Sequence, residues 1–208
     1  MTKRDQRTGD ERDARERLLK AALTLFTQRG YAATTVRELV EAAGVTKPVL
    51  YYYFGSKEGI YLELLRYHFS NIELMFDYYL KSSGKVRGRM IDLFDRIFTF
   101  VLENKDFIRL MHSIYYGPPQ VAPFFDFDAF YGKIHGFVTK IIEEGIRNEE
   151  FQDRDASDMA WIIIGIVLLA MEDQISHHHI AEIDSKDLQR LLNLIFDGLA
   201  ATPGRERS

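Results

Sequence analysis

Two short amphipathic segments, residues 35–43 and 46–54, meet at Gly44, and this pairing constrains the fold more than any other feature of the sequence. Thr35 and Glu38 have the spacing of a capping box, in which the hydroxyl accepts from the N–H three residues on and the carboxylate reaches back. Gly44 supplies the backbone freedom that a tight turn needs. The pattern predicts two short helices that form a helix-turn-helix.

The second segment divides into a buried face and an exposed face. Thr46 can cap it, and Pro48 falls in the first turn, where proline is tolerated. Leu50 and Phe54, four residues apart, should face inward. The opposite face carries one cation and several phenol hydroxyls, which can reach phosphates and base edges. Its residues are Lys47, Pro48, Val49, Tyr51, Tyr52 and Tyr53. An ordinary helical hairpin, with tyrosines packed on neighbouring helices, is the alternative.

Helical periodicity continues along the chain, and no segment alternates as a β-strand does. Residues 1–11 are polar and should form a flexible arm, either a solvated tail or a further DNA contact through Lys3, Arg4 and Arg7. A helix should follow and end at Arg29-Gly30. Further helices are expected over residues 57–80, 87–104, 105–116, 124–148, 156–176 and 186–200. The sequence thus predicts an all-α chain of about nine helices.

The composition excludes several classes of protein. With 208 residues and 46% apolar residues, the chain can bury a sizeable core. Its longest apolar stretch, Ala160 to Met171, is shorter than the roughly 20 residues that cross a bilayer, and no signal peptide precedes it, so a cytoplasmic location is expected. The absence of cysteine removes disulfides, thiolate zinc sites and cysteine nucleophiles.

Charge is distributed unevenly along the chain. Residues 1–60 hold 11 Lys and Arg against 8 Asp and Glu, whereas the whole chain holds 27 against 31 and has a net charge of −4. A mildly basic N-terminal part therefore precedes an acidic remainder. This asymmetry suggests a phosphate-binding domain joined to a domain of another kind.

About residues 15–65 resemble the DNA-binding domain of the tetracycline-repressor (TetR) family of bacterial transcriptional regulators. The resemblance rests on the run LLKAALTLFTQRGYAATTVRELV, which starts at Leu18, and on AGVTKPVLYYYFGSKE, which ends at Glu58. Val40 stands where the family usually has alanine, and Tyr53 stands where histidine is also frequent. Neither departure changes the expected fold.

The resemblance implies roles for individual residues at DNA. Thr35 and Lys57, each at a helix start, would bind backbone phosphates. Tyr51 and Tyr53 match positions that touch sugar and phosphate. Lys47 is the candidate for a directional contact to guanine. The residues expected to contact bases in the major groove are Thr46, Lys47, Pro48, Val49 and Tyr52.

The expected organisation is a flexible arm (1–11), a three-helix helix-turn-helix DNA-binding domain (12–56) and a helical bundle for ligand binding and dimerisation (57–208). The expected function is a ligand-responsive transcriptional regulator, a repressor, that binds a palindromic operator as a homodimer. A helical enzyme or small-molecule carrier with an incidental helix-turn-helix is the alternative function.

The helix expected over residues 156–176 is apolar nearly all round, so it must be covered on several sides. The resemblance implies that it forms, with residues 186–200, a four-helix seam between two copies of the chain. The alternative is that both helices are simply interior. The expected seam residues are Ile162, Gly165, Leu169, Leu188, Leu192 and Ile195.

Residues 94–137 hold 12 of the 27 aromatic residues of the chain. Large rings line pockets for apolar small molecules, although they are also good core residues. A largely hydrophobic effector is therefore expected, rather than a sugar or a nucleotide. The expected pocket wall consists of Phe98, Met111, Tyr115, Phe130 and Trp161.

The sequence contains no phosphate-binding glycine loop, no nucleophile elbow and no His-Glu-x-x-His motif, so we expect no enzyme activity and no cofactor. His177, His178 and His179 would splay about 100° apart on a helix and could not all bind one metal. No metal site is expected.

Overall fold

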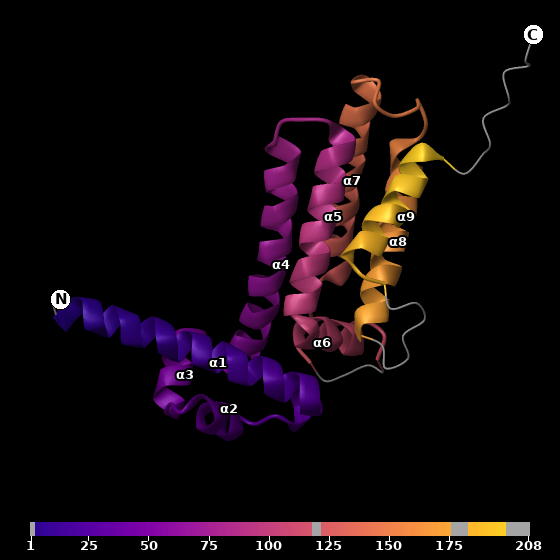
Figure 1. The fold of residues 1–208 in the computed structure, drawn as a ribbon. Helices are drawn as coiled ribbons and strands as arrows, with labels where there is room; N and C mark the ends of the chain where they lie inside the picture. The colour runs from indigo at the N-terminus through magenta and orange to yellow at the C-terminus, as the bar shows by residue number, and fades with distance from the viewer. Residues whose placement is uncertain (1–2, 118–121, 176–182, 199–208) are drawn as a thin grey trace, which may run out of the picture. The chain divides into compact units, whose positions relative to one another are not determined.

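Helices account for the regular structure of this chain. The computed structural model describes residues 3–117, 122–175 and 183–198, with side chains from residue 13 onward, and in these ranges it holds nine α-helices and no strand. They are α1 (Lys3–Ala33), α2 (Val36–Ala43), α3 (Lys47–Phe54), α4 (Lys57–Lys81), α5 (Val86–Glu103), α6 (Lys105–Tyr115), α7 (Phe127–Arg147), α8 (Ala156–Ile175) and α9 (Ser185–Asp197) (Figure 1). The all-α prediction is confirmed. Among the described residues, no helix combines the length and the hydropathy required to span a membrane.

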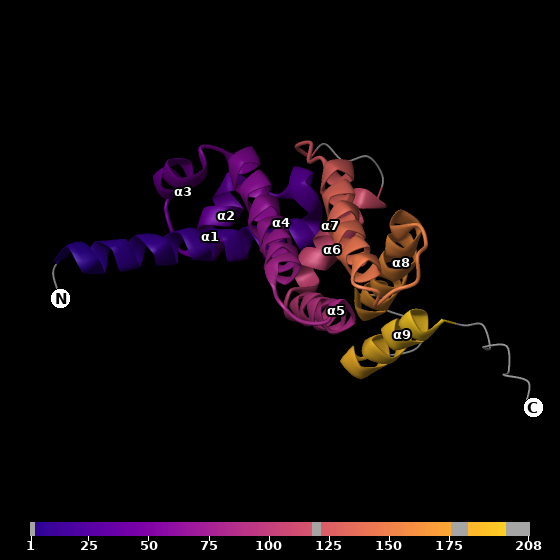
Figure 2. The same cartoon turned by 90° about the horizontal axis from the view of Figure 1, so that it is seen from above.

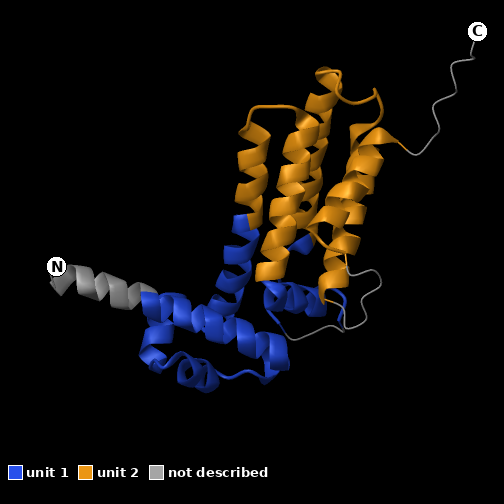
Figure 3. Ribbon diagram, viewed as in Figure 1, with its two compact units in different colours: residues 1–71, 104–127 blue, residues 72–103, 128–208 orange. Residues whose placement is uncertain are grey.

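The chain forms two compact units (Figure 3). Unit 1 comprises residues 1–71 and 104–127, and unit 2 comprises residues 72–103 and 128–208. The division falls inside α4, and α6 belongs to unit 1. The sequence predicts boundaries after residues 11 and 56, whereas the two units divide inside α4.

In unit 1, α2 and α3 pack against one side of α1 (Figure 1). Leu18, Ala22 and Phe26 lie four residues apart along α1 and are almost completely buried. Leu39 of α2 and Leu50 of α3 are also fully buried. This i, i+4 spacing places one apolar stripe of α1 over the two short helices, which buries the inward faces of all three.

The first helix begins earlier than expected, and its regular part is interrupted at the expected end. It begins at Lys3, so residues 3–11, expected to form a separate arm, continue α1. Extending an existing helix costs less than nucleating a new one, and this segment contains no proline. Gly30 has φ 76° and ψ 167°, a conformation open mainly to glycine, which breaks the helix at the expected place.

The α6 helix belongs to unit 1 because it packs on α1 and on the first half of α4. The Thr27 hydroxyl donates to the Asp106 carbonyl at 3.1 Å. The His68 and Phe107 rings stack with centroids 4.0 Å apart. Burial lowers the pKa of His68 to about 4, so its ring is neutral at pH 7.

Unit 2 is a helical bundle that contains an ion pair with a buried arginine. Phe94, Phe98 and Ile163 are among its buried side chains. Arg89, only 6% exposed, pairs with Glu144 at 2.6 Å and donates to backbone carbonyls at the end of α4. The pair satisfies a charge that would be costly to bury alone.

Polar contacts fix α9 against α5, and α9 also lies beside α8 (Figure 2). Arg87 contacts Asn193 and Asp197, each at 2.6 Å. These contacts turn Leu188 and Leu192 inward, where both have 0% exposure. The placement of these two leucines in a seam between copies was therefore wrong, because they belong to the core of their own protomer.

Candidate functional site

The α3 helix is anchored by one residue and presents most of its other side chains to solvent. Leu50 is completely buried, whereas Thr46, Lys47 and Pro48 are exposed. Thr46 is the N-cap residue, but its side chain makes no capping hydrogen bond, and proline lies in the first turn. Leu50 lies inward as expected, whereas Phe54, also expected to face inward, is only half-buried.

The three consecutive tyrosines of α3 differ in exposure. Tyr52 is 76% exposed and Tyr51 is 49% exposed, whereas Tyr53 and Val49 are half-buried. The rings of Tyr52 and Tyr53 meet edge to face at 5.0 Å. Phe54 is half-buried, with the Arg15 guanidinium 5.8 Å from its ring centroid. The outer face therefore combines one ammonium with phenol rings and contains no carboxylate.

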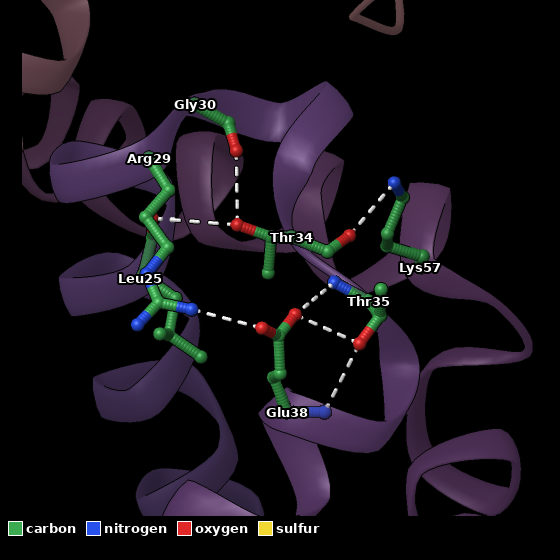
Figure 4. Close-up of polar contacts among 7 residues, drawn as sticks. All are labelled: Leu25, Arg29, Gly30, Thr34, Thr35, Glu38 and Lys57. Atoms are coloured by element: carbon green, nitrogen blue, oxygen red, sulfur yellow. Dashed lines mark hydrogen bonds and ion pairs between the residues drawn. The ribbon is translucent and has the colours of Figure 1, made fainter.

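The α2 helix starts with the predicted capping box (Figure 4). The Glu38 N–H donates to the Thr35 hydroxyl oxygen at 3.3 Å, and the Thr35 N–H donates to the Glu38 carboxylate at 2.8 Å. The Thr35 hydroxyl donates to the same carboxylate at 2.8 Å, and Arg29 donates to its other oxygen at 2.8 Å. These donors, chiefly the Thr35 N–H and hydroxyl, lower the pKa of Glu38.

The turn between α2 and α3 is made at Gly44, as predicted. Its φ of 63° and ψ of 37° are left-handed, and its N–H donates to the Glu41 carbonyl at 3.2 Å. The following Val45 N–H donates to the Val40 carbonyl at 3.0 Å. From α1, Arg17 donates to the Ala43 carbonyl at 3.1 Å, which satisfies another carbonyl at the end of α2.

Lys57 makes contacts that sequence reasoning missed. Its ammonium donates to the carbonyls of Tyr31 and Thr34, each at 3.0 Å, and lies 4.1 Å from the centroid of the Tyr31 ring. The sequence holds no local signal for this arrangement, because residue 57 is 23 and 26 residues away from its partners. The first turn of α4 is thereby tied to the corner between α1 and α2.

Arginines neutralise several carboxylates around the two short helices. Arg37 pairs with Glu41 at 2.6 Å, and Arg29 pairs with Glu38 at 2.8 Å. Arg15 pairs with Glu63 on α4. Exposed ion pairs contribute little to stability, but they reduce the repulsion that these carboxylates would exert on a polyanion.

A second exposed surface lies on α8, in unit 2. Ile162 is 56% exposed and Leu169 is 59% exposed, and Gly165 lies exposed between them. Of the expected α9 residues, Ile195 is half-buried, whereas Leu194, which sequence reasoning missed, is 48% exposed. We call the exposed set the α8 face; it consists of Trp161, Ile162, Gly165, Leu168 and Leu169.

The residues expected to line a pocket are divided between the two units. Phe98 and Phe130 are buried in unit 2, and Trp161 of that unit is exposed, with its ring 4.8 Å from that of His135. Met111, half-buried, and Tyr115, 43% exposed, belong to unit 1. The pocket wall stays a prediction. His177, His178 and His179 lie outside the described residues.

Unit 1 contains a cluster of rings from the aromatic-rich segment. Phe69 of α4 stacks on Phe125 at 4.7 Å and meets Phe107 and Phe127 edge to face at 5.6 and 5.8 Å. Tyr115 meets Phe127 at 5.8 Å. Part of the segment that sequence reasoning assigned to an effector pocket therefore packs within the unit that carries α2 and α3.

The region that contains α2 and α3 is similar in sequence to known proteins. Residues 18–64 match the family described as bacterial regulatory proteins, tetR family. The transcriptional activator FasR of Mycolicibacterium smegmatis is 37% identical over 114 residues, which cover 54% of this chain and 51% of that protein. The transcriptional repressor KstR2 of Rhodococcus jostii is 46% identical over 59 residues, which cover 28% of this chain and 29% of that protein. This chain thus spans about half of FasR and less of KstR2.

Likeness to solved structures extends over most of the chain. The structure of the fatty acid degradation regulator FadR from Bacillus halodurans superposes with a TM-score of 0.68. The match covers 89% of this chain and 96% of that one, at 16% sequence identity. At this identity the likeness establishes a shared fold.

We expect Glu38→Gln to destabilise the fold at pH 7. The pKa of Glu38 is lowered from its ordinary value of 4.5 in the folded chain, so its contacts stabilise the fold above pH 4.5. That contribution is lost as the pH falls through the folded-state pKa. Urea unfolding at pH 7, 4 and 2.5 should show a difference between wild type and variant that shrinks with pH.

Glu41→Gln is the matched control, because it removes an exposed ion pair with Arg37 and no capping contact. It should shift the urea midpoint much less than Glu38→Gln at pH 7. A Glu38→Gln effect of equal size at every pH would contradict the role assigned to the carboxylate.

Proposed function

We propose that this chain, a member of the tetR family of bacterial regulatory proteins, is a transcriptional repressor that binds a near-palindromic operator as a homodimer and is released by a largely hydrophobic small molecule. The observation that carries the proposal is the outer face of α3. It is exposed and free of carboxylates, and it stands on a helix pair fixed by Leu50, the capping box and Gly44.

The α3 residues fall into two groups, those whose side chains can contact bases and those whose side chains can contact phosphates. The Lys47 ammonium can donate to guanine, and the exposed Tyr52 can reach a base edge. Pro48 and Val49 offer apolar contact, for example with a thymine methyl group. Tyr51 and Tyr53 can donate to phosphates, and Thr46 has a hydroxyl that α3 does not use for capping.

A relative named a repressor and the exposed α3 face support repression. KstR2, which is 46% identical over the matched stretch, is named a repressor, whereas FasR is named an activator. A protein on an operator blocks transcription by occupancy alone, so repression requires only the DNA contact that the α3 face supports. We therefore propose repression.

The α8 face supports the homodimer. Its apolar side chains are 44–63% exposed and follow one side of the helix. An apolar patch of this kind is typical of a protein–protein interface. One short recognition helix also contacts too few base pairs for useful affinity, so a pair about 34–36 Å apart is needed for two successive major grooves. The proposed seam is the α8 face with Leu194 and Ile195 of α9.

The rings of the aromatic-rich segment support a hydrophobic effector. They include a cluster around Phe69 in unit 1 and buried Phe98 and Phe130 in unit 2. The α4 helix begins at Lys57 beside the α1–α2 corner and continues to Lys81. An effector that favours another position of α4 would change operator affinity, because a ligand shifts an equilibrium only by its differential affinity for two states.

The DNA contact is tested by selecting genomic fragments with the pure protein and measuring binding of Lys47→Ala to the selected site. We expect a loss of about 1–3 kcal/mol on that site and little change on unrelated DNA. Lys20→Ala, an exposed α1 lysine outside α3, is the control. Equal loss on both DNAs would contradict base reading by Lys47.

The seam is tested by Leu169→Glu, which places a carboxylate in the α8 face. We expect a folded monomer at micromolar concentration in sedimentation and at least tenfold weaker operator binding, since buried unpaired charge is costly. Leu74→Glu on α4, at a site 65% exposed, should leave the dimer intact. A dimeric Leu169→Glu protein would show that the seam lies elsewhere.

The effector class is tested by screening fatty-acid derivatives, aromatic compounds and sugars for release of the selected operator. We expect release by members of the first two groups, because the candidate segment is rich in rings. FadR, one of the solved structures of similar fold, is named for fatty acid degradation. Release by sugars alone would contradict a hydrophobic effector.

A further inference from the structure

We propose that Lys57 acts in operator binding as a positioning residue, which holds the α1–α2 corner in place through the carbonyls of Tyr31 and Thr34 rather than by contact with a DNA phosphate. The inference rests on the proposed function, and it assigns to Lys57 a role different from the one that the family resemblance implies.

The surroundings of the Lys57 ammonium favour contacts within the protein over contact with a DNA phosphate. An ammonium has three N–H donors, and two of them point to carbonyls at 3.0 Å. The Tyr31 ring lies 4.1 Å away, close enough for a cation–π interaction. That ring is itself held by Phe26 at 5.7 Å and Tyr61 at 5.0 Å. Two of the three N–H donors are therefore unavailable to a phosphate unless it displaces a carbonyl.

The corner that Lys57 holds leads directly into α2. Thr34 is 1% exposed, and its hydroxyl donates to the Gly30 carbonyl at 2.9 Å while its carbonyl accepts from Lys57 (Figure 4). The next residue, Thr35, is the N-cap of α2 and is bound on its other side by Glu38. Lys57 and Glu38 therefore hold two consecutive residues from opposite directions.

This arrangement has a consequence for DNA affinity that differs from that of a phosphate contact. A residue that neutralises a phosphate releases counterions, so its removal lowers the salt dependence of binding by about 0.9. A residue that orients α2, and with it α3, leaves that dependence unchanged but weakens the fit to the cognate site. Salt titration thus separates the two roles.

The test compares Lys57→Met, Lys57→Arg and the control Lys20→Met on the selected operator and on unrelated DNA over a range of salt concentrations. We expect Lys57→Met to bind the operator about tenfold more weakly with an unchanged salt slope, and to bind unrelated DNA almost as wild type does. Lys57→Arg should recover most of the affinity, because a guanidinium can also donate to two carbonyls. A slope lowered by about 0.9, with equal loss on both DNAs, would overturn the proposal, as would unchanged operator affinity.

A second measurement needs no DNA. Amide hydrogen exchange at Thr35, Glu38 and Leu39, whose N–H groups are hydrogen-bonded, should be about tenfold faster in Lys57→Met than in wild type and near wild type in Lys57→Arg. Exchange in the middle of α5 should not change. Unchanged exchange at these three residues would overturn the proposal even if Lys57→Met bound DNA poorly. If wild type selects no DNA, the proposed function fails, and the exchange result still decides whether Lys57 holds the corner.

A double variant tests whether Lys57 and Glu38 act on the same corner. If Lys57 and Glu38 act on the same corner, the losses of operator affinity from Lys57→Met and Glu38→Gln should be non-additive. If Lys57 instead binds a phosphate, the two losses should add, which would count against the proposal. Urea unfolding of each variant checks that the compared proteins are folded.

Discussion

The hydrogen bonds at Thr34 and Thr35 determine the direction in which the chain leaves α1 and enters α2. The glycine conformation at residue 30 ends the regular part of α1, and from there the backbone would be free to take many directions. The buried Thr34 and the capped Thr35 select one of them. Because α3 follows α2 across a tight left-handed turn at Gly44, the orientation of the exposed tyrosines depends on these contacts.

The parts of the fold that local chemistry decides could be predicted from the sequence. The capping box needs only a threonine and a glutamate three residues apart, and the turn needs only a glycine between two apolar patterns. The helices of unit 2 follow from apolar periodicity in the same way, with ends within a few residues of those expected. Leu50 could be placed inward for the same reason.

The remaining features depend on contacts between distant residues. The sequence shows that Leu188 and Leu192 are apolar and share a face, but only the contacts of Arg87 with Asn193 and Asp197 show which neighbour covers that face. The bonds from Lys57 to residues 31 and 34 and the place of α6 on α1 are equally nonlocal. Helical periodicity predicts which face of a helix is apolar, and it does not identify the neighbouring element.

The discontinuous composition of unit 1 limits how this protein could be recombined with others. A chimera that joins α1–α3 and the start of α4 to another protein by a single cut in α4 would leave α6 behind. The cut would remove the aromatic partner of His68, 4.0 Å away, and the carbonyl that the Thr27 hydroxyl binds. The transferred segment would then carry an uncovered apolar surface beside α1. Transfer of the proposed DNA-binding face therefore requires residues 104–127 to be moved together with the N-terminal helices, or the exchange to be confined to substitutions on the outer face of α3.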